Sequence, residues 1–241
     1  MNDSAINNTE RHNSTTKSPA PKKPAVTNPA VTNPISRNLE TRTKWDRAAA
    51  TFELIAGEGA EKRWQPNKQK LFARMGDGNI LFMALGTGLD IACFPPHRTI
   101  TAIDISPEML KYAQPRIAQY NGTICAQVMD VHDMPYADNH FDQVFTSCSF
   151  CSIPDPIEGL KALRKTLKPG GELLMFEHTG SKFFPFNLML NIMTPLTNKF
   201  GPAMNRPTID NVRKAGFEII EVDNIYLDVV KTIRAQKPLD D

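Results

Sequence analysis

A glycine-rich turn and two aspartates carry the chemistry that this sequence is expected to perform. The apolar run 79–85 leads into residues 84–88 (Ala-Leu-Gly-Thr-Gly), where small residues at alternate positions let the backbone turn sharply and approach a ligand. Asp104 and Asp130 end the next two apolar runs. Asp104 could accept both hydroxyls of a ribose, and Asp130 could accept from an adenine amino group. Because strand ends of this kind meet at one edge of a sheet, the pattern predicts a nucleoside site.

Alternating strands and helices must position these residues. Apolar runs predict strands over 79–85, 99–105, 123–129, 141–146, 172–177, 217–222 and 225–233. Periodicity and capping residues predict helices over 45–55, 64–72, 109–120, 155–168 and 207–215, with one more after the glycine turn that offers free N–H groups to an anion. The expected fold is α/β: a doubly wound, Rossmann-like, seven-stranded, mostly parallel sheet with helices on both faces and a C-terminal antiparallel strand pair.

The N-terminal segment differs from the rest of the chain in composition. Residues 1–44 hold five of the 19 prolines and no aromatic residue, so they are too poor in apolar side chains to offset the entropy of ordering. We therefore expect a disordered N-terminal tail over 1–44 and one folded domain over 45–241.

Charge and cysteine content exclude several classes of protein. A net charge of +2 gives no basic field for nucleic acid. Four cysteines in 241 residues are too few for a disulfide framework, and they indicate reduced thiols in a cytoplasmic protein. We expect no membrane-spanning segment and no secretory signal.

Four stretches together resemble the class I S-adenosylmethionine-dependent methyltransferases. They are 80–88 (ILFMALGTG), 100–110 (ITAIDISPEML), 128–141 (VMDVHDMPYADNHF) and 167–178 (LKPGGELLMFEH). The resemblance implies S-adenosylmethionine as the cofactor. It implies that Gly86 and Gly88 pack on the methionine part, that Asp104 holds the ribose hydroxyls, that Met109 packs near the adenine, and that Asp130 and the Val131 backbone read the adenine edge. Ala84, Thr87 and Ile105 complete the implied cofactor site.

Two residues depart from the family pattern. Phe82 stands where the family usually has an acid, and Ala84 stands where it has a first glycine. Asp90, just after the turn, is a candidate substitute for the missing carboxylate. A catalytically silent, cofactor-binding regulatory protein is therefore an alternative. An NAD-linked reductase is another, although Ile91 fills the third small position of the dinucleotide motif.

The methyl acceptor is expected to be a small molecule. The fourth strand leads into 146–151 (TSCSFC), which lacks the Asn/Asp-Pro-Pro-Tyr motif of base amine methylation. Residues 149–156 (SFCSIPDP) and the pair 177–178 resemble a branch with bacterial phosphatidylethanolamine N-methyltransferases, quinone C-methyltransferases and methyltransferase-like thiol S-methyltransferases. We expect a thiol or an amine, with phospholipid N-methylation and quinone C-methylation as alternatives.

Several further residues have open roles. His178 and Arg206 are candidate catalytic or substrate-binding residues. The apolar insert, 183–205, is expected to be a lid, and its segment 183–196 could instead contact a membrane surface transiently or form core or dimer surface. Cys148 and Cys151 form a single CxxC, which favours core packing or pocket lining over a metal site, and no metal is expected. The sequence leaves the oligomeric state open.

Overall fold

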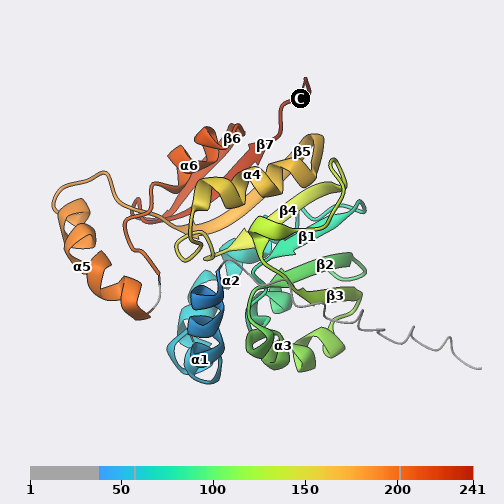
Figure 1. The fold of residues 1–241 in the computed structure, drawn as a ribbon, viewed down its shortest axis with the longest axis horizontal. Helices are drawn as coiled ribbons and strands as arrows, with labels where there is room; N and C mark the ends of the chain where they lie inside the picture. Colours follow the sequence, from blue (N-terminus) through green and yellow to red (C-terminus); the bar gives the residue numbers. More distant parts are fainter. Residues whose placement is uncertain (1–37, 57, 201, 241) are drawn as a thin grey trace, which may run out of the picture. The chain divides into compact units, whose positions relative to one another are not determined.

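The computed structural model describes residues 38–56, 58–200 and 202–240 (Figure 1). Most of the expected tail, residues 1–37, lies outside the described residues. Residues 39–44, which were expected to belong to the tail, instead form the first turns of helix α1, Leu39–Ala56. Helix α1 therefore begins before Trp45.

Seven strands form one sheet, as predicted. They are β1 (Ile80–Met83), β2 (Thr99–Asp104), β3 (Thr123–Val128), β4 (Phe141–Ser147), β5 (Leu167–His178), β6 (Glu218–Tyr226) and β7 (Val230–Gln236). Their order is β3-β2-β1-β4-β5-β7-β6. The first five strands run parallel, and β7 lies antiparallel to both β5 and β6. The chain reverses its direction of winding between β1 and β4, which is where α/β sheets bind ligands.

Helices cover both faces of this sheet (Figure 1). After α1 they are α2 (Glu58–Phe72), the 3₁₀ helix η1 (Leu89–Cys93), α3 (Pro107–Gln119), the 3₁₀ helix η2 (Val131–Asp133), α4 (Pro156–Thr166), α5 (Phe186–Phe200) and α6 (Thr208–Lys214). The start of α3 follows the expected capping pattern, because Ser106 Oγ accepts a hydrogen bond from Met109 N at 3.1 Å.

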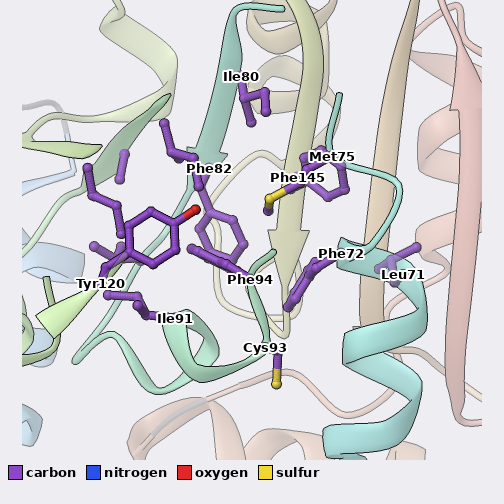
Figure 2. Close-up of a cluster of buried hydrophobic side chains, with 14 of the residues drawn as sticks. Leu71, Phe72, Met75, Ile80, Phe82, Ile91, Cys93, Phe94, Tyr120 and Phe145 are labelled. Atoms are coloured by element: carbon purple, nitrogen blue, oxygen red, sulfur yellow. The ribbon is translucent and has the colours of Figure 1, made fainter. Parts of the chain in front are cut away.

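Side chains alternate between two cores because successive strand residues point to opposite faces. Phe82, Phe145 and Phe176 pack with residues of α2 and α3 on one face. Figure 2 shows Phe82 and Phe145 in this cluster. Leu81 and Met83 belong to the second cluster, with residues of α4 and α6. The two cores hold β1 rigidly in the middle of the sheet, and its carboxyl end supplies the glycine-rich turn.

One local expectation is wrong, and two elements have details that the sequence analysis did not include. The helix expected after the glycine turn is the five-residue 3₁₀ helix η1. The insert contains a regular helix, α5, with Pro195 inside it. The C-terminal hairpin turns after Tyr226, so the second strand begins at Val230 and not at Ile225. Apolar periodicity could not locate that turn, because the residues on both sides of it suit a strand.

Candidate active site

A cavity of about 310 Å³ opens at the carboxyl ends of β1, β2 and β4. Its floor comes from these strands and their loops, and its cover comes from α1 and α2. The cavity therefore lies at the point where the strand order reverses, the usual place for a ligand in a doubly wound sheet.

The turn after β1 has the backbone that its small residues predict. Ala84, Gly86 and Gly88 have φ values of 60°, 60° and 80°, in the left-handed region. A Cβ atom added at Gly86 would meet no heavy atom within 4 Å, so the backbone there is open to a ligand. A Cβ atom added at Gly88 would lie 3.0 Å from Ile91 Cδ1 and 3.2 Å from Ala113 Cβ. Gly88 is therefore required for packing against α3.

Asp104 links this turn to the end of β2. Its Oδ2 accepts from Gly86 N and its Oδ1 accepts from Ser106 N, both at 2.8 Å. Burial raises the pKa of the carboxyl to about 6, although these two N–H groups oppose the rise. The carboxylate is thus held rigidly at the cavity wall, with lone pairs left for further donors.

Asp130 lies just before η2, and several hydrogen-bond donors already surround its carboxylate. Its Oδ1 accepts from His132 N at 3.0 Å, and its Oδ2 accepts from the Asn38 side-chain amide at 2.8 Å. His132 Nδ1 lies 2.8 Å from the same carboxylate. The Asn38 contact shows that an amino donor fits against Asp130 from the cavity side.

A buried ion pair closes another wall of the cavity. Lys68 Nζ of α2 lies 2.7 Å from Asp90 Oδ1 of η1, and both residues line the cavity. Asp90 is the residue that was expected to substitute for the missing acid. Sequence reasoning missed Lys68, because the pairing depends on how α2 crosses η1 and no local spacing signals it.

The remaining wall is apolar and carries two unsatisfied hydroxyls. Trp45 and Phe52 of α1 and Trp64 of α2 face the loop 147–154 across the cavity. Thr87 Oγ1 and Ser147 Oγ line the cavity and are buried without a hydrogen-bond partner among the described residues. Buried hydroxyls of this kind are available to a polar ligand.

Cys148 is the other chemically distinctive residue of that loop. It lines the cavity with its backbone at φ 49°, in the left-handed region, and all four cysteines are free. Although the residue has exposed surface, desolvation by the surrounding protein, with the Glu177 carboxylate nearby, raises the pKa of the thiol above its ordinary value. The side chain therefore lines the pocket as a neutral thiol.

Glu177 holds the same loop from behind. Its Oε1 accepts from Thr146 Oγ1 at 2.8 Å and from Ser149 Oγ at 3.1 Å, and its Oε2 accepts from the backbone N–H groups of Ser149 and Phe150, both at 3.1 Å. The residue is fully buried, and burial raises its pKa to about 7. Glu177 is therefore a positioning residue for the cavity wall.

Comparison with known proteins agrees with this geometry. Residues 81–175 match the model of a methyltransferase domain. The chain is 34% identical over 134 residues to the ubiquinone/menaquinone biosynthesis C-methyltransferase UbiE of Geotalea daltonii, an alignment that covers 53% of this chain and 57% of that one. It is 25% identical over 179 residues to the human thiol S-methyltransferase TMT1B, covering 68% of this chain and 72% of that one.

A solved structure shows the same fold. The SAM-dependent methyltransferase of Thermotoga maritima described as a possible histamine N-methyltransferase superposes with a TM-score of 0.59 at 16% identity, covering 82% of this chain and 99% of that one. Residues 81–175 are therefore similar to the methyltransferase domain of class I S-adenosylmethionine-dependent enzymes. The chain spans little more than half the length of the first curated relative that it matches.

The methyltransferase fold explains the departure at Phe82. This side chain is buried among other aromatic rings, with ring centroids 5.6 Å from Phe72 and 4.9 Å from Phe94 (Figure 2). It belongs to the core beneath α2 and η1 and does not line the cavity. The cavity instead has the Asp90 carboxylate, paired with Lys68, beside the glycine turn.

The expected site residues separate into two groups. Every expected cofactor residue except Gly88 lines the cavity, namely Ala84, Gly86, Thr87, Asp104, Ile105, Met109, Asp130 and Val131. The two expected catalytic residues do not line it. Burial lowers the pKa of His178, and Arg206 Nη2 donates to Ile153 O at 3.3 Å behind the cavity loop.

Proposed function

We propose that this protein transfers a methyl group from S-adenosylmethionine to a small-molecule nucleophile, and that a thiol is the acceptor class the site supports best. The observation that carries the proposal is the cavity itself, which joins a wall with two strand-end carboxylates, Asp104 and Asp130, to an apolar wall. The match of residues 81–175 to a methyltransferase domain supports S-adenosylmethionine as the cofactor.

The polar wall suits the cofactor part by part. Asp104 would accept hydrogen bonds from the ribose hydroxyls. The adenine amino group would donate to Asp130 in the place where the Asn38 amide now donates. The open backbone at Gly86 would leave room for the methionine part. The Lys68–Asp90 pair offers one charge of each sign, which would complement the carboxylate and the ammonium of an amino acid.

The demands of each acceptor bear on the choice between them. Bound S-adenosylmethionine supplies an electrophilic methyl group on a sulfonium, and the enzyme must mainly align the nucleophile and exclude water. The ionisable residues that line the cavity include Cys148, whose pKa is raised, and His132, whose Nδ1 lies 2.8 Å from the Asp130 carboxylate. A thiol with a pKa of about 8.5 is partly ionised near neutral pH without help from the site, so it asks less of the protein than an amine or a ring carbon, which needs a base.

Quinone C-methylation is the second candidate. Its support is the cluster of Trp45, Phe52 and Trp64 on the apolar wall, which suits a flat ring. The relative from Geotalea daltonii carries a name from this reaction.

The compartment is a further part of the proposal. All four cysteines are free, although Cys148 and Cys151 are close in sequence. Free thiols support a reducing compartment such as the cytoplasm. Among the described residues, no helix is long and apolar enough to cross a membrane.

A product assay by mass spectrometry tests the function. The full chain is incubated with S-adenosylmethionine and, separately, with alkyl thiols, primary amines, phosphatidylethanolamine and a demethylated quinol. We expect a methyl thioether from the thiols, reduced strongly in Asp104→Ala and unchanged in Asp138→Ala, an exposed acid far from the cavity. A methylated quinol without any thioether would favour the second candidate. Calorimetric binding of the cofactor without any product would indicate a regulatory protein that binds without turnover.

A further inference from the structure

Helix α5 is amphipathic, but its polar side faces the protein and its apolar side faces outward, the reverse of an ordinary surface helix. Leu190 and Thr194 are buried, and Asn187 and Thr197 are half-buried, so the side facing the protein is largely polar. These residues recur at helical spacing. The Thr194 hydroxyl forms its hydrogen bond within the helix, because it donates to Leu190 O at 2.7 Å. The inner face therefore needs no apolar partner.

The outer face of α5 is apolar. Leu188, Ile192 and Leu196 are 50%, 70% and 65% exposed, and they follow one another four residues apart on one stripe. Two phenylalanines just before the helix, Phe183 and Phe184, are 66% and 79% exposed. Figure 1 shows α5 set apart from the sheet and from the helices that cover it. A contiguous apolar surface of this kind marks an interaction site.

The segment that carries this surface has basic residues and no acid. The sequence contains no Asp or Glu between Glu177 and Asp210, whereas it contains Lys182, Lys199 and Arg206. Lys182 is exposed and directly precedes Phe183. Asp228 is an acid that contacts the segment from outside it, and its carboxylate already accepts from Ser181 Oγ at 2.6 Å and from Lys182 N at 2.7 Å. The apolar surface therefore has the exposed Lys182 beside it.

We propose that α5 together with Phe183 and Phe184 docks on an anionic lipid surface. An apolar helical face next to Lys side chains is the combination that binds an interface containing acidic lipids. The 15 residues of α5 span roughly 22 Å at helical rise, short of the roughly 30 Å of a bilayer core. The helix therefore lies in the plane of the interface.

The charge pattern distinguishes this occupant from a second copy of the chain. If two copies of the chain faced each other through α5, their Lys182 side chains would approach each other. These like charges would repel. A negatively charged leaflet instead gives each lysine a favourable partner, of about 1 kcal/mol per basic residue near the surface.

Docking would also place the active site next to the lipid. The segment that follows α5 is tied to the cavity loop, since Ala203 N donates to Cys151 O at 2.9 Å. β5 ends at His178, on the edge of the sheet that holds the cavity, and leads directly into the insert. The inference concerns a surface outside the cavity, so it does not depend on which acceptor is methylated.

Vesicle flotation with the full chain tests the inference. The probes are vesicles of phosphatidylcholine alone and of phosphatidylcholine with phosphatidylserine in equal parts, mixed with wild type, Ile192→Glu and Ile220→Glu. Ile220 is the matched control, because it is an isoleucine 47% exposed on β6, away from α5. We expect wild type and Ile220→Glu to float with the mixed vesicles, and Ile192→Glu to bind about tenfold more weakly, which corresponds to about 1.4 kcal/mol.

Three results would overturn the inference. One is wild-type protein that stays unbound with the mixed vesicles, and another is Ile192→Glu that floats as wild type does. The third is a dimer by analytical ultracentrifugation that Ile192→Glu dissociates while no form binds lipid, since a second copy would then cover α5. The variant Lys182→Gln tests the role of the positive charge, and it should weaken binding to the mixed vesicles. The control is Lys161→Gln, a surface change on α4, which should not weaken binding.

Discussion

Lys68 Nζ lies 2.7 Å from Asp90 Oδ1, and the two side chains are only 7% and 12% exposed. The pair joins α2 to η1 beside the glycine turn, so it couples the cover of the cavity to its floor. A buried carboxylate is tolerated here because the ammonium group is its partner.

Lys68→Met should therefore destabilise the protein by about 3–5 kcal/mol, because it leaves Asp90 buried and unpaired. The double variant Lys68→Met/Asp90→Leu should regain most of that loss, since it buries no charge. Urea unfolding of both variants measures the difference. The exposed pair Lys161–Glu158 is the control, and its removal should change the free energy of unfolding by less than about 1 kcal/mol. Equal losses in the single and double variants would contradict the buried-pair interpretation.

Cofactor binding should depend on the ionisation of Asp104. The pKa of its carboxyl is raised to about 6, and the ionised form is the better acceptor for two hydroxyls. Affinity for S-adenosylhomocysteine should therefore rise as the pH increases to about 6, by at most about tenfold per pH unit, and level off above it. Calorimetry from pH 5 to pH 8 measures this profile. Asp104→Asn should bind more weakly and lose the rise; an unchanged profile in this variant would assign the titration to another group.

Glu177 should make the protein less stable as the pH rises. Its pKa is raised from 4.5 to about 7 in the folded state, so the folded protein holds a proton that the unfolded chain has lost. The contribution is fully present below pH 4.5 and is lost as the pH rises through about 7, at about 1.4 kcal/mol per pH unit.

Glu177→Gln removes this dependence while keeping the hydrogen bonds. The amide oxygen can accept from the N–H groups of Ser149 and Phe150, and the amide nitrogen can donate to the hydroxyls of Thr146 and Ser149. The stability of the variant relative to wild type should increase from pH 5 to pH 8 in chemical denaturation. A constant difference between the two proteins across that range would refute the titration of Glu177.

Ala84→Gly should make the protein slightly more stable. Ala84 has φ 60°, a left-handed conformation, which costs a residue with Cβ about 1–2 kcal/mol. Glycine removes that cost but gives the unfolded chain about 0.4–1 kcal/mol of additional entropy, so we expect a net gain of up to about 1 kcal/mol in thermal or urea unfolding. Ala118→Gly, at an exposed position of α3, should instead lower stability by about 0.5–1 kcal/mol. A loss at both positions would show that Ala84 is not strained.

The parts of the fold that depend on local chemistry could be predicted from the sequence. The turn at 84–88 follows from small residues, the start of α3 follows from Ser106 and Pro107, and the buried strands follow from continuous apolar runs. That Asp104 and Asp130 come together at one cavity could be predicted for the same reason, because they follow adjacent strands.

The parts that depend on distant contacts could not be predicted. Lys68 reaches Asp90 only after α2 folds over the sheet, and Asn38 reaches Asp130 across 92 positions. His178 ends a strand on the ligand side, yet its side chain does not line the cavity. Periodicity gives the face of an element, but the distance from that face to a cavity depends on how the elements pack.

The short η1 helix has a consequence for which nucleotides can enter. A long helix after the turn would present a positive end to a pyrophosphate, but η1 has five residues and carries the Asp90 carboxylate in its first turn. Because Lys68 neutralises Asp90, the floor of the cavity offers no net positive charge to a pyrophosphate. It would suit a nucleoside without phosphates better than a dinucleotide.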